Sequence, residues 1–391
     1  MNQDGYASRL VRVQECLCKL NLDAVVLMKP RNMFYVTGYN AVIYSRPQYV
    51  IVRPYDKAVL IIPRVRETRA RRSARVQDIL TFDEFETVEE KRDPIKLLAA
   101  TLRKMISGRG RIGVEADFMP VNTHGLLSKS LRGWETADFT AELQQLRMIK
   151  DEQEIENVHK AAVLAEAGMQ AAVDAIRSGA TEIEVNIVAE NAMREAWSDR
   201  YSNDDIVGFG DNEDGVISAL WCSTRAGARF GVSFPSSTHE DIPDGEAVLV
   251  IIWTYVNGYI AEIERTIFKG RPVENRRTTY QVMMRAREKV RQAVRPGAVC
   301  EDLVAVVDRV MNESGFRHGP GSVGHGIGLG HHEPPFMVPG QATQLEPGMV
   351  LTLEPGILFP DYGVRHSDTV LVTDDECISL TTWDRFTELE A

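Results

Sequence analysis

The segment GYIAEIERT, residues 258–266, constrains the fold more than any other part of this sequence. Side chains alternate along a strand, so Glu262 and Glu264 would share one face while Arg265 points to the other. Carboxylates crowded on one face cannot all ionise cheaply, so a proton or a cation has to neutralise some of them. The segment therefore predicts a sheet with a polar site on one face.

Two further polar segments follow on or beside predicted strands. A glycine-rich loop, GHGIGLGHHEPP at 324–335, carries His325 and His332. LEPG at 353–356 places Glu354 at a strand end, and GVRHSD follows at 363–368. Any one of these residues could be structural. Histidine and carboxylate together in this order indicate general acid–base or metal chemistry.

The amino-acid composition limits the classes of protein and partner that need to be considered. A chain of 391 residues with 44% hydrophobic and 26% charged residues is long enough for two well-buried domains. The net charge of −11 argues against a nucleic-acid or anionic-membrane partner. We see no apolar run of membrane-spanning length and no signal peptide in MNQDGYASRL, and five irregularly placed cysteines are typical of free thiols. We therefore expect a cytoplasmic protein.

Periodicity predicts two domains, 1–145 and 146–391. The first reads as a small α/β domain, with a helix at 6–21 and strands at 24–28, 33–36, 49–52, 58–62 and 111–115. The second reads as α+β, with helices at 151–177, 181–198, 274–294 and 300–314 and strands at 247–253, 259–268, 349–354 and 369–372. Thr181 and Glu184 are spaced as a capping box at one helix start.

Taken together, these motifs resemble a known family. GHGIGLGHHEPP, LEPG and the G-x-R-x-x-D-T-V-L-V strand resemble the C-terminal domain of aminopeptidase P, prolidase and creatinase. GYIAEIERT and LRMIKDEQEI extend the match, and NMFYVTGY and RIGVEADF resemble the family's N-terminal domain. The resemblance implies a pita-bread catalytic domain behind a smaller α/β domain. It also implies a homodimer whose partner subunit reaches into the active site.

The resemblance breaks at the metal centre. The family's peptidases hold two ions with two aspartates, a histidine and two glutamates, and three of these positions fall at Glu262, His325 and Glu354 here. The other two fall at Ile251, which cannot coordinate, and at Ser367, a poor ligand for a hard cation. We therefore expect no two-metal centre and no cofactor. A single divalent ion on the three remaining ligands is left open as an alternative.

Creatinase works without metal, and part of this chain is similar to it. Glu264 matches a substrate-binding glutamate, and Tyr44-Ser45-Arg46 resembles a clamp that the partner subunit contributes. Creatinase's catalytic histidine, however, aligns with Phe234, and the glutamate of its R-E-H-D strand aligns with His366, which alternation points away from Ser367. The expected substrate-binding residues are Glu264, Arg46, Tyr44, Phe234, Trp253 and Arg365.

The leading functional hypothesis is metal-independent hydrolysis of a C–N bond in a small polar molecule of amidino, guanidino or amino-acid-like type. His325, His332, Glu262 and Glu354 would be catalytic, one histidine would shuttle the proton, and the carboxylates would hold a substrate cation. The first alternative is an Xaa-Pro dipeptidase or aminopeptidase with one metal ion. The second is a binding protein that kept the fold without the chemistry.

Overall fold

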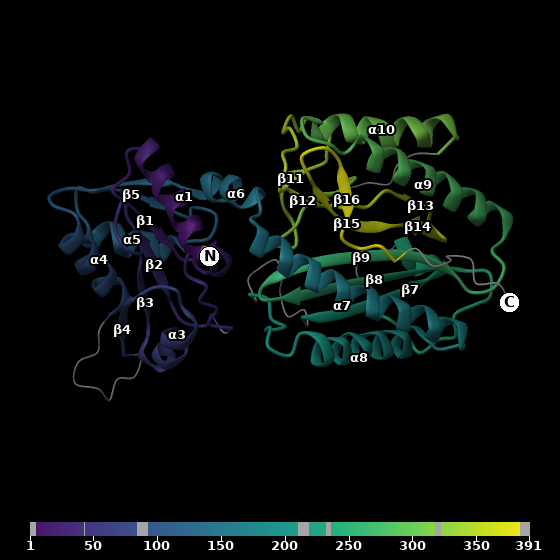
Figure 1. The fold of residues 1–391 in the computed structure, drawn as a ribbon, viewed down its shortest axis with the longest axis horizontal. Coiled ribbons are helices and arrows are strands. Elements are labelled where there is room, and N and C mark those ends of the chain that lie inside the picture. Colours follow the sequence, from purple (N-terminus) through teal and green to yellow (C-terminus); the bar gives the residue numbers. More distant parts are fainter. Residues whose placement is uncertain are drawn as a thin grey trace. The chain divides into compact units, whose positions relative to one another are not determined.

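The structure is a computed structural model that describes residues 5–42, 44–83, 93–209, 219–231, 236–316 and 322–383. The described residues form two compact units (Figure 1). The N-terminal unit comprises residues 5–147 with Phe209, and the C-terminal unit comprises residues 148–208 with those from 219 onward. The domain boundary after residue 145 stays a sequence-based prediction.

The N-terminal unit is a six-stranded mixed sheet flanked by helices. Its strand order is β4-β3-β2-β1-β5-β6, in which β1, β5 and β6 run parallel and β2 runs antiparallel to both β1 and β3. The elements are α1 (Gly5–Lys19), β1 (Ala24–Leu27), α2 (Pro30–Thr37), β2 (Tyr49–Val52), β3 (Val59–Pro63), α3 (Glu67–Ser73), β4 (Asp78–Phe82), α4 (Pro94–Met105), β5 (Arg111–Val114), α5 (Val121–Ser130), β6 (Glu135–Asp138) and α6 (Thr140–Met148).

One predicted strand of this unit, residues 33–36, is wrong because these residues lie in helix α2. Pro30 occupies the first turn, and Gly38 ends the helix in the left-handed region with φ of 66°. All eight residues of the helix are buried, so the apolar run shows no amphipathic period. Periodicity alone cannot separate a short buried helix from a strand.

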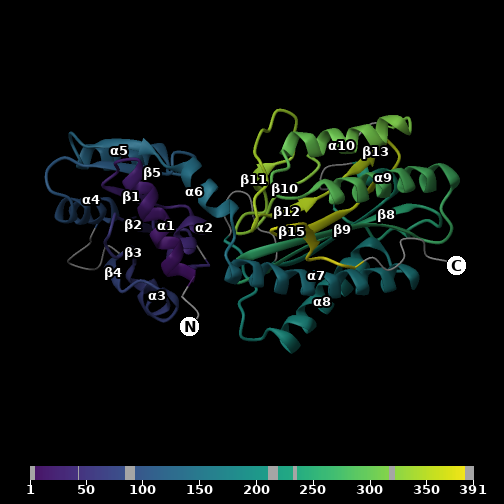
Figure 2. The same ribbon diagram turned by 45° about the horizontal axis from the view of Figure 1, so that its top comes forward.

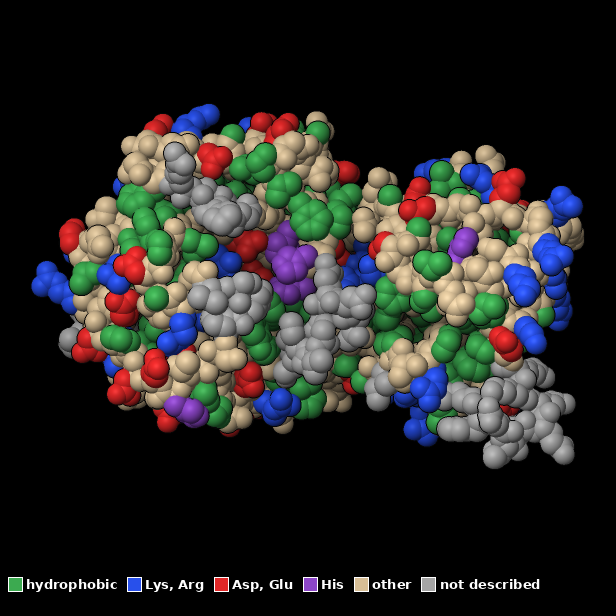
Figure 3. Space-filling view, turned by 180° about the vertical axis from the view of Figure 1, so that it is seen from behind, with side chains coloured by type: hydrophobic (Ala, Val, Ile, Leu, Met, Phe, Trp, Pro, Cys, Tyr) green, Lys and Arg blue, Asp and Glu red, His purple; other side chains and the backbone are tan. Residues whose placement is uncertain are grey.

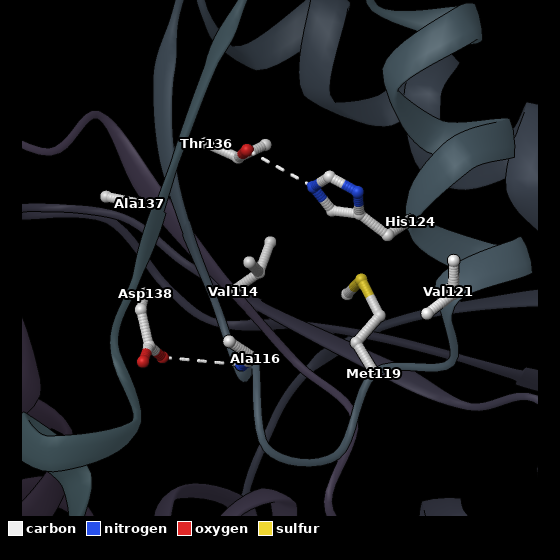
Figure 4. A pocket seen from close by; sticks show the side chains of 8 residues that line it. All are labelled: Val114, Ala116, Met119, Val121, His124, Thr136, Ala137 and Asp138. Carbon is white, nitrogen blue, oxygen red and sulfur yellow. Dashed lines mark hydrogen bonds between the residues drawn. The ribbon is translucent and has the colours of Figure 1, made fainter.

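A pocket of about 300 Å³ lies at the carboxyl ends of β5 and β6 (Figure 4). His124 on α5 points toward Thr136 on β6, and its Nε2 atom lies 3.2 Å from Oγ1 of that threonine. The carboxylate of Asp138 accepts a hydrogen bond from the backbone of Ala116. These polar side chains already have partners within the pocket wall, and none of the predicted site residues lines it.

The C-terminal unit is built on an eight-stranded antiparallel sheet. Its path is β11-β10-β12-β15-β9-β8-β7, and β16 pairs with β15. The strands are β7 (Leu220–Ala226), β8 (Ala247–Val256), β9 (Tyr259–Phe268), β10 (His325–Gly326), β11 (Glu333–Phe336), β12 (Val350–Leu353), β15 (Ser367–Val372) and β16 (Cys377–Ser379), with β13 (Gly356–Leu358) and β14 (Gly363–Arg365) forming a separate ribbon. Strands β7, β10, β11, β13, β14 and β16 were not predicted.

Four long helices cover this sheet in two pairs (Figures 1 and 2). Helices α7 (Glu152–Arg177) and α8 (Glu182–Arg200) pack against strands β7, β8 and β9. Helices α9 (Glu274–Ala293) and α10 (Cys300–Glu313) pack against each other on the opposite side and contribute to one apolar core with β12 and β15. The predicted capping box of Thr181 and Glu184 is present at the start of α8. This arrangement confirms the α+β pita-bread class.

The hairpin of β8 and β9 forms the centre of the unit, and every residue of both strands is buried. Asn257 and Gly258 connect the strands with positive φ angles of 51° and 83°, the conformation that a tight two-residue hairpin requires. The turn fixes the register that sets Trp253 opposite Glu262 and Ile251 opposite Glu264. Among the helices that the structure describes, none combines the length and apolar character needed to cross a bilayer.

Candidate active site

Strand β9 carries the polar face that the sequence predicted. Glu262 and Glu264 point to one side, while Arg265 on the other side donates hydrogen bonds to the backbone oxygen of Trp383 and to Asp368, the latter at 2.7 Å. Arg287 completes this buried cluster with a 2.5 Å bond to Asp368. The two arginines neutralise Asp368 and anchor β15 beside β9, so the two glutamates are left to form a separate site.

The carboxylate of Glu262 is almost fully enclosed and accepts hydrogen bonds at both oxygens. His331 Nε2 and Trp253 Nε1 each lie 2.9 Å from Oε2, and the hydroxyl of Ser367 donates to Oε1. Burial alone would raise the pKa of Glu262, but the hydrogen bond and charge of His331, with the nearby His325 and Ser367, lower it overall. Glu262 is therefore held as a hydrogen-bonded carboxylate.

His331 is a site residue that the sequence did not predict, since only His332 of the adjacent pair was named as a candidate. Its ring lies edge-on to Trp253, with 3.8 Å between ring centroids, and stacks on His332 at 4.3 Å. Trp253 in turn stacks on Trp221 at 4.4 Å. This aromatic row orients the His331 ring toward Glu262, a contact between residues 69 positions apart that no local sequence pattern could reveal.

His325 and Glu354 form the second pair of the site. Nε2 of His325 lies 3.4 Å from Oε1 of Glu354, and Nδ1 lies 3.0 Å from the backbone oxygen of Gly326. Burial lowers the pKa of His325. Burial, together with the neighbouring charge of Glu262, raises the pKa of Glu354 well above its ordinary value. The pair therefore favours a neutral imidazole beside a protonated carboxyl group.

His332 is exposed, and its ring centroid lies 4.4 Å from that of His325. In the space-filling view, histidine side chains gather in a hollow of the C-terminal unit beside acidic side chains (Figure 3). The structure thus brings together all four residues that were predicted to be catalytic, which are His325, His332, Glu262 and Glu354.

Glu264 is paired within the protein. Nη2 of Arg365 donates a hydrogen bond to Oε1 of Glu264 at 2.5 Å, and Nε of the same arginine forms an ion pair with the other oxygen. Burial raises the pKa of Glu264 to about 7 despite this arginine. Arg365 therefore supplies a cation to Glu264 from within the protein, and a substrate cation at this carboxylate would have to compete with it.

The glycines of the histidine segment serve strand packing. A Cβ atom on Gly324 would lie 2.0 Å from the backbone oxygen of Thr352, and one on Gly326 would lie 2.2 Å from that of Pro334. Only glycine allows β10, β11 and β12 to approach this closely. His325 therefore stands on a short strand, β10, rather than on the predicted loop.

The remaining predicted substrate-binding residues lie in several places. Trp253 is 4% exposed and belongs to the site wall. Tyr44 and Arg46 lie in the N-terminal unit, where the Tyr44 hydroxyl contacts the side-chain oxygen of Asn40. Phe234 lies outside the described residues. His366 points away from the site as predicted, with Nδ1 2.8 Å from Sδ of Met284.

The two-ion centre of the resembled peptidases does not fit these residues. Ile251 lies on β8 opposite Glu264 and offers no ligand atom, and the hydroxyl of Ser367 is directed to Glu262. Oε2 of Glu262 accepts from two donors, which occupies both of its lone pairs. Glu262 therefore cannot bridge two ions.

Comparison with known proteins agrees with this fold. The model of the metallopeptidase family M24 matches residues 156–374, and the creatinase/prolidase N-terminal domain matches residues 9–149. An uncharacterized peptidase of Staphylococcus aureus strain USA300 is 26% identical over 96% of this chain and 100% of its own length.

Two solved structures illustrate the similarity. The dipeptidase PepE of Mycobacterium ulcerans has a TM-score of 0.82 and 26% identity, and the match covers 100% of this chain and 98% of that one. The prolidase of Pyrococcus horikoshii OT3 has a TM-score of 0.81 and 24% identity, over 97% and 99% of the two chains. The family model spans more than half of this sequence. The chain therefore belongs to metallopeptidase family M24, a family of peptidase-type hydrolases.

Proposed function

We propose that this chain hydrolyses a C–N bond in a small amino-acid-like substrate, using His325 and Glu354 and no two-metal centre. The observation that carries the proposal is the facing pair itself, with 3.4 Å between Nε2 of His325 and Oε1 of Glu354. Membership of metallopeptidase family M24 supports the reaction class, because peptidases hydrolyse C–N bonds.

The pair has the proton chemistry that such a hydrolysis requires. A carbonyl oxygen only accepts, so the contact with Gly326 places the proton of a neutral His325 on Nδ1 and leaves Nε2 as a base. Burial favours the protonated form of Glu354 beside it. A neutral base next to a protonated acid can take a proton from water and deliver one to the leaving nitrogen.

The charges around the site favour the amino-acid-like class among the predicted substrates. A guanidino or amidino group would have to displace Arg365 from Glu264, which is enclosed and paired with this arginine by a hydrogen bond at one oxygen and an ion pair at the other. Arg365 itself keeps 30% of its side chain exposed. Its guanidinium group could meet a substrate carboxylate, the ligand that arginine binds best. The exposed His332 would border the same substrate.

A second candidate function is an Xaa-Pro peptidase or dipeptidase that uses one divalent ion. One ligand atom from each of Glu262, His325 and Glu354 lies within 4.8 Å of the other two. These residues would hold the ion, which would supply Lewis-acid chemistry when bound. The similarity to the dipeptidase PepE of Mycobacterium ulcerans, at 26% identity, supports this alternative.

The test is activity of the full chain before and after chelation, with elemental analysis of the purified protein. The substrate panel consists of N-acyl amino acids, Xaa-Pro dipeptides and guanidino acids. We expect less than one divalent ion per chain, activity on amino-acid-derived amides, and little loss to a chelator. Activity that disappears on chelation and returns with one ion would establish the second candidate instead. Binding of two ions would contradict the proposal.

We also propose that the active protein is a homodimer with a shared site. The support is the resemblance of Tyr44-Ser45-Arg46 to the creatinase clamp that a partner subunit contributes. In this arrangement, Arg46 of one chain would hold the carboxylate of a substrate bound in the other.

A further inference from the structure

Three elements distant in the sequence converge on one carboxylate in the C-terminal unit. The three side chains that contact Glu262 come from different elements. Trp253 lies on β8, Ser367 lies on β15, and His331 lies in the segment between β10 and β11. Glu262, Ser367 and His331 are each no more than 2% exposed. An enclosed carboxylate with three protein donors is a built arrangement, because each donor had to be brought out of water to make its bond.

A count of lone pairs shows what this arrangement does. The two oxygens of a carboxylate offer about four acceptor positions in all. Oε2 accepts from His331 and Trp253, and Oε1 accepts from Ser367, so one position remains. The indole of Trp253 also stacks on Trp221, which keeps its N–H from swinging away to admit an ion.

We propose that Trp253, His331 and Ser367 form a hydrogen-bond cage that occupies three of the four acceptor positions of Glu262 and so weakens its binding of metal ions. The cage makes Glu262 a positioning residue: its carboxylate fixes His331 and, through the stacked rings, His332. His325 and Glu354 keep the proton transfer. This inference rests on the proposed function and explains how an M24 chain dispenses with the metal that its remaining ligands would otherwise attract.

The other two candidate metal ligands of the site, His325 and Glu354, lie outside the cage. His325 Nε2 and the Glu354 carboxylate face each other at 3.4 Å, longer than a normal hydrogen bond, so this contact would not keep an ion from binding both groups. An ion that gained one more acceptor position on Glu262 would find these two ligands in place. Removing one cage donor should therefore strengthen metal binding at these three residues.

The experiment measures Mn²⁺ binding to the full-length chain by isothermal titration calorimetry and by electron paramagnetic resonance of the bound ion. His331→Phe keeps the ring between its aromatic neighbours but removes the N–H group. His332→Phe makes the same change in the neighbouring ring and leaves the cage intact. We expect His331→Phe to bind one Mn²⁺ at least about tenfold more tightly than the parent chain, because the ion no longer has to displace a hydrogen bond from the carboxylate, while His332→Phe does not.

A second variant keeps the test valid if His331→Phe does not fold. Ser367→Ala removes the donor to Oε1 with a minimal change of shape, and Ser379→Ala on the adjacent strand β16 is its control. Equal Mn²⁺ affinity in the parent, His331→Phe and Ser367→Ala would overturn the cage, whether all bind the ion or none does. Weak binding in all three would leave the proposed hydrolysis intact, whereas two tightly bound ions in the parent would contradict that function as well.

Discussion

The ammonium group of Lys150 lies 3.1 Å from Oε1 of Glu333, and side-chain exposure is 1% for the lysine and 7% for the glutamate. The other oxygen of Glu333 accepts a hydrogen bond from the backbone of Gly330 at 3.1 Å. The glutamate therefore clamps the short segment that contains His331 and His332. Lys150 precedes helix α7, so the start of that helix and the histidine segment are held by one ion pair.

Lys150→Met should destabilise the protein, because it leaves Glu333 buried without its cation. The expected loss in free energy of unfolding is about 3–5 kcal/mol, the usual cost of removing one partner of a buried ion pair. Denaturant unfolding of the full chain measures it. Lys129→Met, an exposed lysine of α5, should change stability by no more than about 0.5 kcal/mol. Similar losses in both variants would show that the ion pair contributes little.

His325→Gln should lower turnover by roughly 10²–10⁴-fold, the usual contribution of general acid–base catalysis. Glutamine keeps a polar group of similar size in this buried position but cannot take up the proton. Steady-state kinetics on the best substrate of the panel measures the effect. His239→Gln, at an exposed histidine that is not part of the candidate site, serves as the control. If His325→Gln folds normally and keeps near-parental turnover, the proton shuttle has been assigned to the wrong histidine.

Much of the site could be predicted where its geometry follows from one strand. Alternation along β9 is a local property, so the shared face of Glu262 and Glu264 was readable from GYIAEIERT. The side chains that bind these two glutamates could not be predicted from the sequence. His331 and Arg365 are 69 and 101 positions away from them in the sequence, and only the register of the folded sheet brings them together.

A related reason explains four of the missed strands. Strand β10 has two residues, and β13, β14 and β16 have three each, which is too short for a period-two pattern to emerge. Their positions depend on pairing with longer neighbours. The misassigned segment 33–36 shows the opposite limit, since a fully buried helix carries no polar face to mark its period.

Mixing two inactive variants tests the shared site of the proposed homodimer. Arg46→Ala would remove the substrate clamp, and Glu354→Gln would remove the acid of the proton-transfer pair. A hybrid dimer should contain one site with neither change, so mixing should recover about a quarter of parental activity if the chains exchange randomly. Activity assays on the mixed and separate variants, with size-exclusion chromatography, measure this. A monomeric protein, or no recovery after exchange, would contradict the shared site.

Glu115, in the N-terminal unit, should make stability depend on pH. It is fully buried at the end of β5 and accepts hydrogen bonds from Asn32 and from the backbones of Met28 and Lys29. Burial outweighs these bonds and raises its pKa from 4.5 to about 7.

Between pH 4.5 and 7 the unfolded chain therefore releases the proton of Glu115 while the folded chain retains it, so ionisation stabilises the unfolded state. The free energy of unfolding should fall by about 3 kcal/mol as the pH rises through this window. Above pH 7 this group should cause no further change with pH. Denaturant unfolding of the full chain at a series of pH values measures the slope. Glu115→Gln should remove this part of the slope because glutamine does not titrate, whereas Glu135→Gln, an exposed residue of β6, should keep it. A slope that survives in Glu115→Gln would show that other buried groups set the pH dependence.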